Sequence, residues 1–206
     1  MANSIIARLE HRVYLELKKK KLKNHNPTII SSNCNGAYIL HDLGLKFNTP
    51  TVNLYFETKD YLKFVSNLDK YLSAELIEIE SNYSYPVGQL DDINIYFMHY
   101  GSFDEAKLKW NERKKRVNKD NMFLIMSDRN HCTYEDLITF DNLPFKNKIV
   151  FTHKPYPEIK SAVYIKGFEE ESEVGVLSDW KPTFLKRRYL DDFDYVRFLN
   201  NSTKRC

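Results

Sequence analysis

Short apolar segments that alternate with helical segments are the feature that most constrains the fold of this chain. β-Branched and apolar runs are typical of strands, and apolar residues at three- and four-residue spacing are typical of amphipathic helices. The predicted strands span residues 28–32, 51–56, 75–80, 86–90, 93–98, 122–126, 148–152 and 162–165, and the predicted helices span residues 4–23, 37–43, 59–72, 104–117, 134–140 and 191–199. Because such alternation favours an α/β fold, we predict a three-layer α/β/α sandwich with a mixed, largely parallel sheet.

The chain is expected to form a single α/β domain over residues 1–206, since neither a repeat nor a linker interrupts it. Residues 86–98 are expected to form a hairpin around the acidic turn Asp91-Asp92, which would make the sheet mixed. A hydrophobic content of 42% excludes a disordered chain. The net charge of +3 is too small to indicate nucleic-acid binding.

Residues 1–25 are expected to form an N-terminal basic amphipathic helix. Its apolar side chains recur at helical spacing, at Ile5, Ile6, Leu9, Val13 and Leu17, and it ends in the basic run 18–23. Basic residues complement the carboxyl end of a helix dipole, so a solvated end is the simpler interpretation. Peripheral contact with a membrane surface or a polyanion is the alternative, and the basic helix 104–117 has the same two interpretations.

The location is expected to be cytoplasmic. The charged N-terminal segment lacks the apolar core of a signal peptide, and no apolar run approaches the roughly 18 residues of a spanning helix. The three cysteines, Cys34, Cys132 and Cys206, are dispersed, which fits a reducing compartment. Their spacing and that of the histidines does not indicate a zinc site, so neither a metal nor a cofactor is expected.

Polar clusters follow four of the predicted strands at the point where each strand ends. Their principal members are Ser32, Asn33, Asn35, His99, Asp128, Arg129, Thr152, His153 and Lys154. Since the carboxyl ends of parallel strands meet at one edge of a sheet, we predict that Asn33, His99, Asp128 and Thr152 share one cleft. Ordinary loop polarity, including a local salt bridge between Asp128 and Arg129, is the simpler alternative.

The residue types at these strand ends predict an anion site with acid–base chemistry. Asp128 and His99 are the expected catalytic pair, because proton transfer needs groups whose pKa can be moved near neutrality. Helix N-termini together with basic side chains suit a phosphate or carboxylate group. The expected ligand-binding residues are Ser32, Asn33, Asn35, Arg129, Thr152 and Lys154. Cys34 as a nucleophile, paired with His99 or His153, is an alternative.

Several standard sequence motifs of enzymes are absent, and this narrows the possible reaction classes. The chain contains no P-loop, no G-x-G-x-x-G after the first strand and no G-x-S-x-G elbow. The pair Asp91-Asp92 is not an Asp-x-Asp metal signature, and 206 residues leave little room for separate donor and acceptor domains of a complete glycosyltransferase. The residues therefore predict where a site lies more closely than which reaction it performs.

Several segments together resemble one uncharacterised bacterial family, whose members are labelled domain of unknown function or exopolysaccharide biosynthesis protein. The segments are Asn33-Cys34, residues 85–92, residues 97–100, Glu105-Ala106, Lys109-Trp110, Arg113, residues 118–121, Ser127-Asp128-Arg129, Cys132, Leu143-Pro144-Phe145, Phe151-Thr152 and Pro155-Tyr156-Pro157. The resemblance runs from about Pro27 to the region of Asp194, which leaves the N-terminal helix outside it. His131 stands where the family pattern has a small residue, which counts against His131 as a catalyst.

The resemblance implies an α/β/α fold with a mixed sheet and a role in capsule or exopolysaccharide assembly, and it brings no catalytic residues with it. We therefore expect a group or glycosyl transferase that acts on a sugar nucleotide or a phosphorylated sugar, with other polysaccharide-assembly enzymes as partners. A non-catalytic glycan-binding or accessory protein of a polysaccharide-assembly complex is the alternative.

Overall fold

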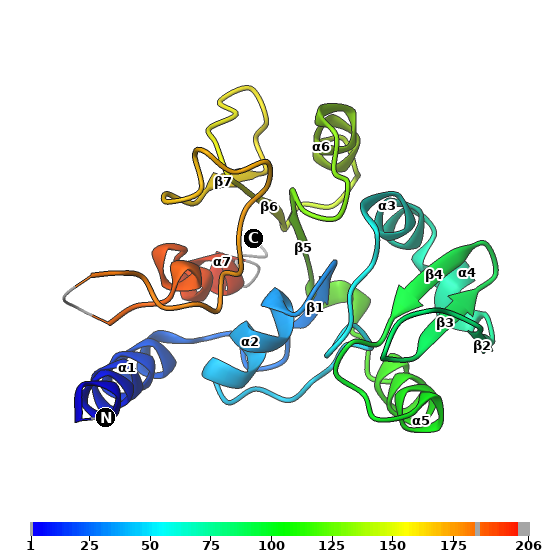
Figure 1. The fold of residues 1–206 in the computed structure, drawn as a ribbon, viewed down its shortest axis with the longest axis horizontal. Coiled ribbons are helices and arrows are strands. Elements are labelled where there is room, and N and C mark those ends of the chain that lie inside the picture. Colours follow the sequence, from blue (N-terminus) through cyan, green and yellow to red (C-terminus); the bar gives the residue numbers. More distant parts are fainter. Residues whose placement is uncertain (1, 184–185, 202–206) are drawn as a thin grey trace.

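The computed structural model describes residues 2–183 and 186–201, and the side chains from residue 8 onward within that range. Its four parallel strands form one sheet in the order β1 (Thr28–Ser31), β5 (Met122–Ser127), β6 (Lys148–Thr152) and β7 (Ala162–Tyr164). Three antiparallel strands, β2 (Leu76–Ile79), β3 (Val87–Leu90) and β4 (Ile93–Tyr96), form a second sheet (Figure 1). The α/β class and the parallel strands are thus confirmed.

The hairpin is also confirmed, but it belongs to the second sheet and does not extend the parallel one. Asp91 adopts a positive φ of 53° in its tight turn, a conformation that aspartate tolerates well. Residues 51–56, expected as a strand, form only an isolated bridge between Tyr55 and Tyr96. The reason is geometric, because this segment connects the two sheets: Phe56 N–H donates to the Ser32 carbonyl of the parallel sheet at 2.9 Å, while Tyr55 pairs with the antiparallel sheet.

The helices are α1 (Ala2–Lys21), α2 (Asn35–Asp42), α3 (Thr58–Ser66), α4 (Leu68–Ser73), α5 (Phe103–Lys114), α6 (Tyr134–Asp141) and α7 (Tyr195–Asn200). The predicted helix 59–72 is divided at Asn67, whose φ of −134° is not helical. The predicted helix 191–199 is a short 3-10 turn, Tyr189–Asp192, followed by α7, because the Asp194 side chain caps α7 by accepting from Arg197 N–H.

The parallel sheet is buried on both faces. Ile29 and Phe123 pack in one core cluster with apolar residues of α2 and α7. Ile30 and Leu124, the next residues of the same strands, pack in another cluster with residues of α3, α5, α6 and the antiparallel sheet. This alternation is what consecutive strand residues produce when each face is covered. Figure 1 shows α2 and α7 on one side of the sheet and α3 and α6 on the other, whereas the regular three-layer sandwich stays a prediction.

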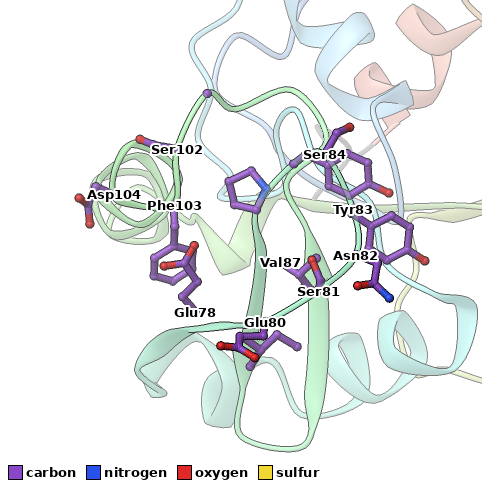
Figure 2. A pocket seen from close by; sticks show the side chains of 14 residues that line it. Glu78, Glu80, Ser81, Asn82, Tyr83, Ser84, Val87, Ser102, Phe103 and Asp104 are labelled. Carbon is purple, nitrogen blue, oxygen red and sulfur yellow. The ribbon is translucent and has the colours of Figure 1, made fainter.

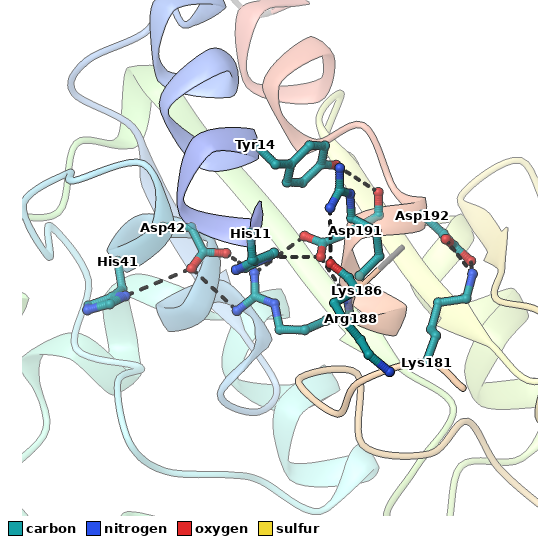
Figure 3. A network of polar contacts seen from close by, with 10 residues as sticks. His11, Tyr14, His41, Asp42, Lys181, Lys186, Arg188, Asp191 and Asp192 are labelled. Carbon is teal, nitrogen blue, oxygen red and sulfur yellow. Dashed lines mark hydrogen bonds and ion pairs between the residues drawn. The ribbon is translucent and has the colours of Figure 1, made fainter. Parts of the chain in front are cut away.

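Helix α1 is confirmed, but its orientation differs from what an amphipathic pattern ordinarily implies. The apolar stripe of a surface helix usually faces the core, yet Leu9, Val13 and Leu17 are 56%, 62% and 55% exposed. Among the side chains of this helix that the structure describes, only His11 is buried, and its Nε2 lies 3.0 Å from Asp191 Oδ2. Figure 3 shows this contact within a network of polar side chains through which α1 contacts the rest of the protein.

Candidate functional site

A cavity of about 350 Å³ lies beyond the carboxyl ends of β1 and β5. Four of the predicted site residues line it: Asn33 and Asn35 after β1, His99 after β4, and Arg129 after β5. Since ligands of open α/β sheets bind beyond this edge, the cavity stands where a site is expected. His99 reaches it by a route other than the predicted one, because β4 belongs to the antiparallel sheet.

The other predicted residues do not line this cavity. Ser32 and Thr152 are buried, and Thr152 Oγ1 donates to the Lys154 carbonyl at 2.8 Å. The Lys154 side chain is exposed and its ammonium lies 5.7 Å from the centre of the Tyr156 ring. Asp128 is buried as well. Of the four residues predicted to share one cleft, Asn33 and His99 line the cavity. Asp128 and Thr152 are buried and do not line it.

The turn from β1 into α2 is held by its own side chains. Asn33 Oδ1 accepts from Asn35 N–H at 3.1 Å, and its Nδ2 donates to Ser127 Oγ at 2.8 Å. Ser31 Oγ accepts from Gly36 N–H at 3.2 Å. The backbone N–H groups of Asn35 and Gly36, at the start of α2, are thus already bonded within the turn. A Cβ on Gly36 would lie 2.8 Å from Ser31 Cβ, so only glycine lets α2 begin this close to β1.

Asp128 does not line the cavity, but it bonds to residues next to it. Its Oδ2 accepts from His153 N–H at 2.8 Å and lies 2.5 Å from His153 Nδ1, while Oδ1 accepts from Val174 N–H at 2.7 Å. The Val174 contact fixes the start of residues 175–178, which line the cavity. A carboxylate with both oxygens engaged is suited to positioning this loop, and its predicted role in proton transfer stays a prediction.

Arg129 does not form the local salt bridge with Asp128 that was the simpler alternative. Its Nε lies 3.3 Å from Glu173 Oε1, and Glu173 Oε2 accepts from Asn130 N–H at 3.1 Å. Asn130 and His131 both adopt positive φ, 60° and 62°, so the strand ends in a left-handed turn. The His131 ring, 91% exposed, contacts Glu57 Oε2 at 2.8 Å, and this hydrogen bond raises the pKa of His131.

Several polar groups of the cavity make no hydrogen bond to another part of the chain that the structure describes. They are the Asn35 side-chain amide, the Tyr38 hydroxyl, the His99 ring nitrogens and the two terminal nitrogens of Arg129. Because these groups line an open cavity, they are available to a ligand. Their position beyond the carboxyl edge of the parallel sheet makes this cavity the candidate site.

The thiol of Cys34 also lines the cavity. Burial raises the pKa of Cys34, and Sγ donates weakly to the Leu54 carbonyl at 3.8 Å. A protonated thiol is a poor nucleophile, so the environment does not favour the alternative of covalent catalysis at this residue. Burial likewise raises the pKa of Cys132, to about 12.

Three tyrosines that line the cavity were missed by the sequence interpretation: Tyr38, Tyr55 and Tyr85. The hydroxyls of Tyr55 and Tyr85 lie 3.0 Å apart, and burial together with this hydrogen bond raises the pKa of Tyr55. Tyr55 also stacks on Tyr96 with ring centres 4.6 Å apart. The only signal in the sequence was the high aromatic content of 14%, which gives no position.

A larger cavity, of about 1080 Å³, lies elsewhere, between residues 78–87 and the start of α5. Figure 2 shows Ser102, Phe103 and Asp104 on one side of it and Asn82 and Tyr83 on the other. Its charged lining residues are all acidic, and none of the predicted site residues takes part. We therefore place the candidate site in the smaller cavity, where a base, a guanidinium and amides come together.

Within residues 2–183 and 186–201, no group of three or more His, Cys, Asp or Glu side chains is arranged to hold a metal ion. Among the helices of the same residues, none combines the length and the apolar character that crossing a membrane requires.

The chain was compared with known proteins. An uncharacterized protein of Haemophilus influenzae is 49% identical over 187 residues, which cover 89% of this chain and 89% of the relative. A family described as a domain of unknown function (DUF1919) matches residues 5–200. The match includes most of α1, which the resemblance found in the sequence had left outside. The expected membership of an uncharacterised bacterial family is thus confirmed, and the chain belongs to the DUF1919 family.

Proposed function

We propose that this protein is a group or glycosyl transferase of exopolysaccharide or capsule biosynthesis, acting on a sugar nucleotide or a phosphorylated sugar. The observation that carries the proposal is the cavity at the carboxyl edge of the parallel sheet, whose polar groups have unused hydrogen-bonding capacity. Its location is proposed to be the cytoplasm, which the dispersed cysteines favour.

The lining of the cavity suits a ligand that is part sugar and part phosphate. Tyrosine rings offer flat apolar faces on which the C–H face of a sugar ring packs, together with hydroxyls that bond sugar oxygens. The Asn35 amide both donates and accepts, as sugar hydroxyls require. The terminal nitrogens of Arg129 form a fork that fits phosphate oxygens, and the Glu173 contact holds this fork in place.

Proton transfer is assigned to His99, because its exposed ring lines the cavity and an imidazole can both accept and donate a proton. Asp128 is assigned the positioning of residues 175–178 through Val174. Arg129 is proposed to hold the phosphate, whereas Lys154 is not, because Lys154 does not line the cavity. Asn33 shapes the β1–α2 turn that presents Asn35.

Thermal-shift measurements with nucleotide sugars, nucleotides and sugar phosphates test the proposal. At least one ligand should raise the melting temperature of the wild-type chain and of Lys154→Gln, but not of Arg129→Gln. Both residues are basic and follow strands of the same sheet, so Lys154→Gln is a matched control for lost charge. Mass spectrometry of products formed from that ligand and acceptor sugars then tests for transfer. If no ligand of the three classes shifts the wild-type protein, the proposal fails.

A second candidate function is that of a non-catalytic glycan-binding or accessory protein of a polysaccharide-assembly complex. The observation in its favour is a tyrosine cluster that extends from the cavity: Tyr83 stacks on Tyr85 with ring centres 5.0 Å apart and contacts Tyr96 edge-on at 5.5 Å. Tyr83 is 52% exposed, which leaves a ring free to pack on a sugar. Equal polymer production by cells carrying wild-type protein and His99→Ala, together with loss of oligosaccharide binding in Tyr83→Ala, would favour this second function.

A further inference from the structure

Helix α1 leaves a row of apolar side chains exposed, the last of which, Leu17, also lines a cavity of about 590 Å³ beside α7. Leu9, Val13 and Leu17 are each more than half exposed, and their four-residue spacing places them in one row along the helix. The same apolar spacing continues in the sequence to Ile5 and Ile6, whose side chains lie outside the described residues. Single exposed apolar residues are ordinary, but a row of them on one helix marks an interaction surface. We define this outer row as Leu9, Val13 and Leu17.

The opposite side of α1 is polar and is already occupied. His11 contacts Asp191, and the Tyr14 hydroxyl donates to the Asp191 carbonyl at 3.3 Å. The Lys18 ammonium lies 3.6 Å from the centre of the Tyr195 ring, and burial lowers the pKa of Lys18 to about 8. The helix is therefore attached through polar contacts, and the outer row is not needed to hold it in place.

The charges beside the outer row identify the kind of partner. Arg12 and Lys20 are exposed and lie three residues from Leu9 and Leu17, so they border the row. Arg8 and Lys21 are exposed as well. Glu10 and Glu16, each three residues from Val13, border the row as well, but the basic residues of α1 outnumber them. Such a helix, with an exposed apolar row and a net basic charge, is the kind that lies in the surface of an anionic membrane.

We propose that the outer row of α1 binds the surface of an anionic lipid bilayer. Leu9, Val13 and Leu17 enter the boundary between headgroups and acyl chains, and the bordering Arg12 and Lys20 contact lipid phosphates. Pairing with α1 of a second copy would bring two basic helices together without a compensating acidic surface, so charge repulsion disfavours it. The proposal is independent of the proposed transferase activity, because α1 does not line the cavity.

Co-sedimentation of the full chain with lipid vesicles tests the proposal. The wild-type chain should bind vesicles of phosphatidylcholine mixed with phosphatidylglycerol, and should not bind vesicles of phosphatidylcholine alone. The variant Leu9→Ser/Val13→Ser/Leu17→Ser should lose at least about tenfold in partitioning, because burial of apolar side chains contributes to interfacial binding. Its melting temperature should stay unchanged, since the three side chains are exposed.

Leu108→Ser is the matched control. Leu108 is 57% exposed on α5, the other basic helix, but it has no apolar neighbours in a row. Its substitution should leave vesicle binding unchanged. The proposal is overturned if the wild-type chain does not bind the mixed vesicles, or if the triple variant binds them as well as the wild type does. A wild-type dimer in sedimentation equilibrium that the triple variant abolishes would also overturn it, in favour of a second copy.

Discussion

Two regions of the molecule concentrate charged and polar side chains, and they differ in what those side chains contact. Between α1, α2 and residues 188–192, the Arg188 guanidinium pairs with Asp42 and Asp191, and Asp191 also contacts His11 (Figure 3). We name this the α1 network. Around the carboxyl-edge cavity, by contrast, His99 and the terminal nitrogens of Arg129 have no partner in the part of the chain that the structure describes.

The difference shows that a high local number of titratable residues does not by itself indicate a ligand-binding site. In the α1 network most polar atoms bond to one another, with Arg188 Nε as a buried exception, so the region serves the attachment of elements. In the cavity the same residue types keep capacity for a ligand. Removing a partner should therefore cost stability in the α1 network and binding in the cavity.

Arg188→Ala should cause the largest loss. Arg188, Asp42 and Asp191 are all buried, with side-chain exposures of 9%, 4% and 1%, so the substitution leaves two carboxylates without their cation. Breaking a buried ion pair from one side costs about 3–5 kcal/mol. Urea denaturation should show this decrease in the free energy of unfolding. Arg129→Ala is the control, because its contact with Glu173 is partly exposed and such pairs contribute about 0–1 kcal/mol.

Asp128→Asn should cause a smaller loss of stability and should also weaken ligand binding in the cavity. An amide in place of the carboxylate weakens the bonds to His153 and Val174, and an unsatisfied buried donor costs about 1–3 kcal/mol. Because residues 175–178 then lose their anchor, ligand-induced thermal shifts should decrease together with stability. A variant that keeps its stability and its ligand binding but loses transfer would contradict the positioning role and support the predicted catalytic one.

The sequence predicted the parallel strands and their polar ends well, because both depend on local patterns. Runs such as residues 122–126 are apolar at consecutive positions, as strands buried on both faces require. The sequence could not predict that β4 belongs to the antiparallel sheet. Sheet membership depends on which strands pair, and these strands can be far apart in the chain. His99 therefore reached the predicted cavity although the reason given for its position was wrong.

Two other features were beyond the reach of local patterns. Tyr55 and Tyr85 come together only because residues 51–56 connect the two sheets, a contact between distant segments. Helical spacing correctly predicted a row that includes Leu9 and Leu17, but spacing does not say which side of a helix faces the core. In α1 the polar contacts of His11 decide the orientation, and no sequence period reports them.

Acid should weaken the α1 network. Burial opposes the ionisation of Asp191, but hydrogen bonds from the His11 ring and the Arg188 N–H outweigh it and hold the pKa of Asp191 below its ordinary value of 3.8. Such a carboxylate contributes its stability above the unfolded pKa, and the contribution is lost as pH falls through the folded pKa. Urea denaturation across the range below about pH 4 should therefore show a steeper decline for wild type than for Asp191→Asn. Parallel declines would contradict this assignment.

His99→Ala should have the smallest effect on stability and a large effect on function. The ring is exposed and bonds to no described residue, so the free energy of unfolding should change by no more than about 0.5 kcal/mol. His153→Ala is the matched control, because this buried ring contacts Asp128 and its loss should destabilise the fold without removing a group from the cavity. If His99 moves a proton in the proposed transfer, the rate should fall by about 10²–10⁴-fold. The comparison between the two histidines then separates a group that lines the cavity from one that supports its surroundings, since one substitution should affect turnover and the other unfolding. A strongly destabilised His99→Ala, or one with unchanged turnover, would remove His99 from the site and leave the cavity without its acid–base group.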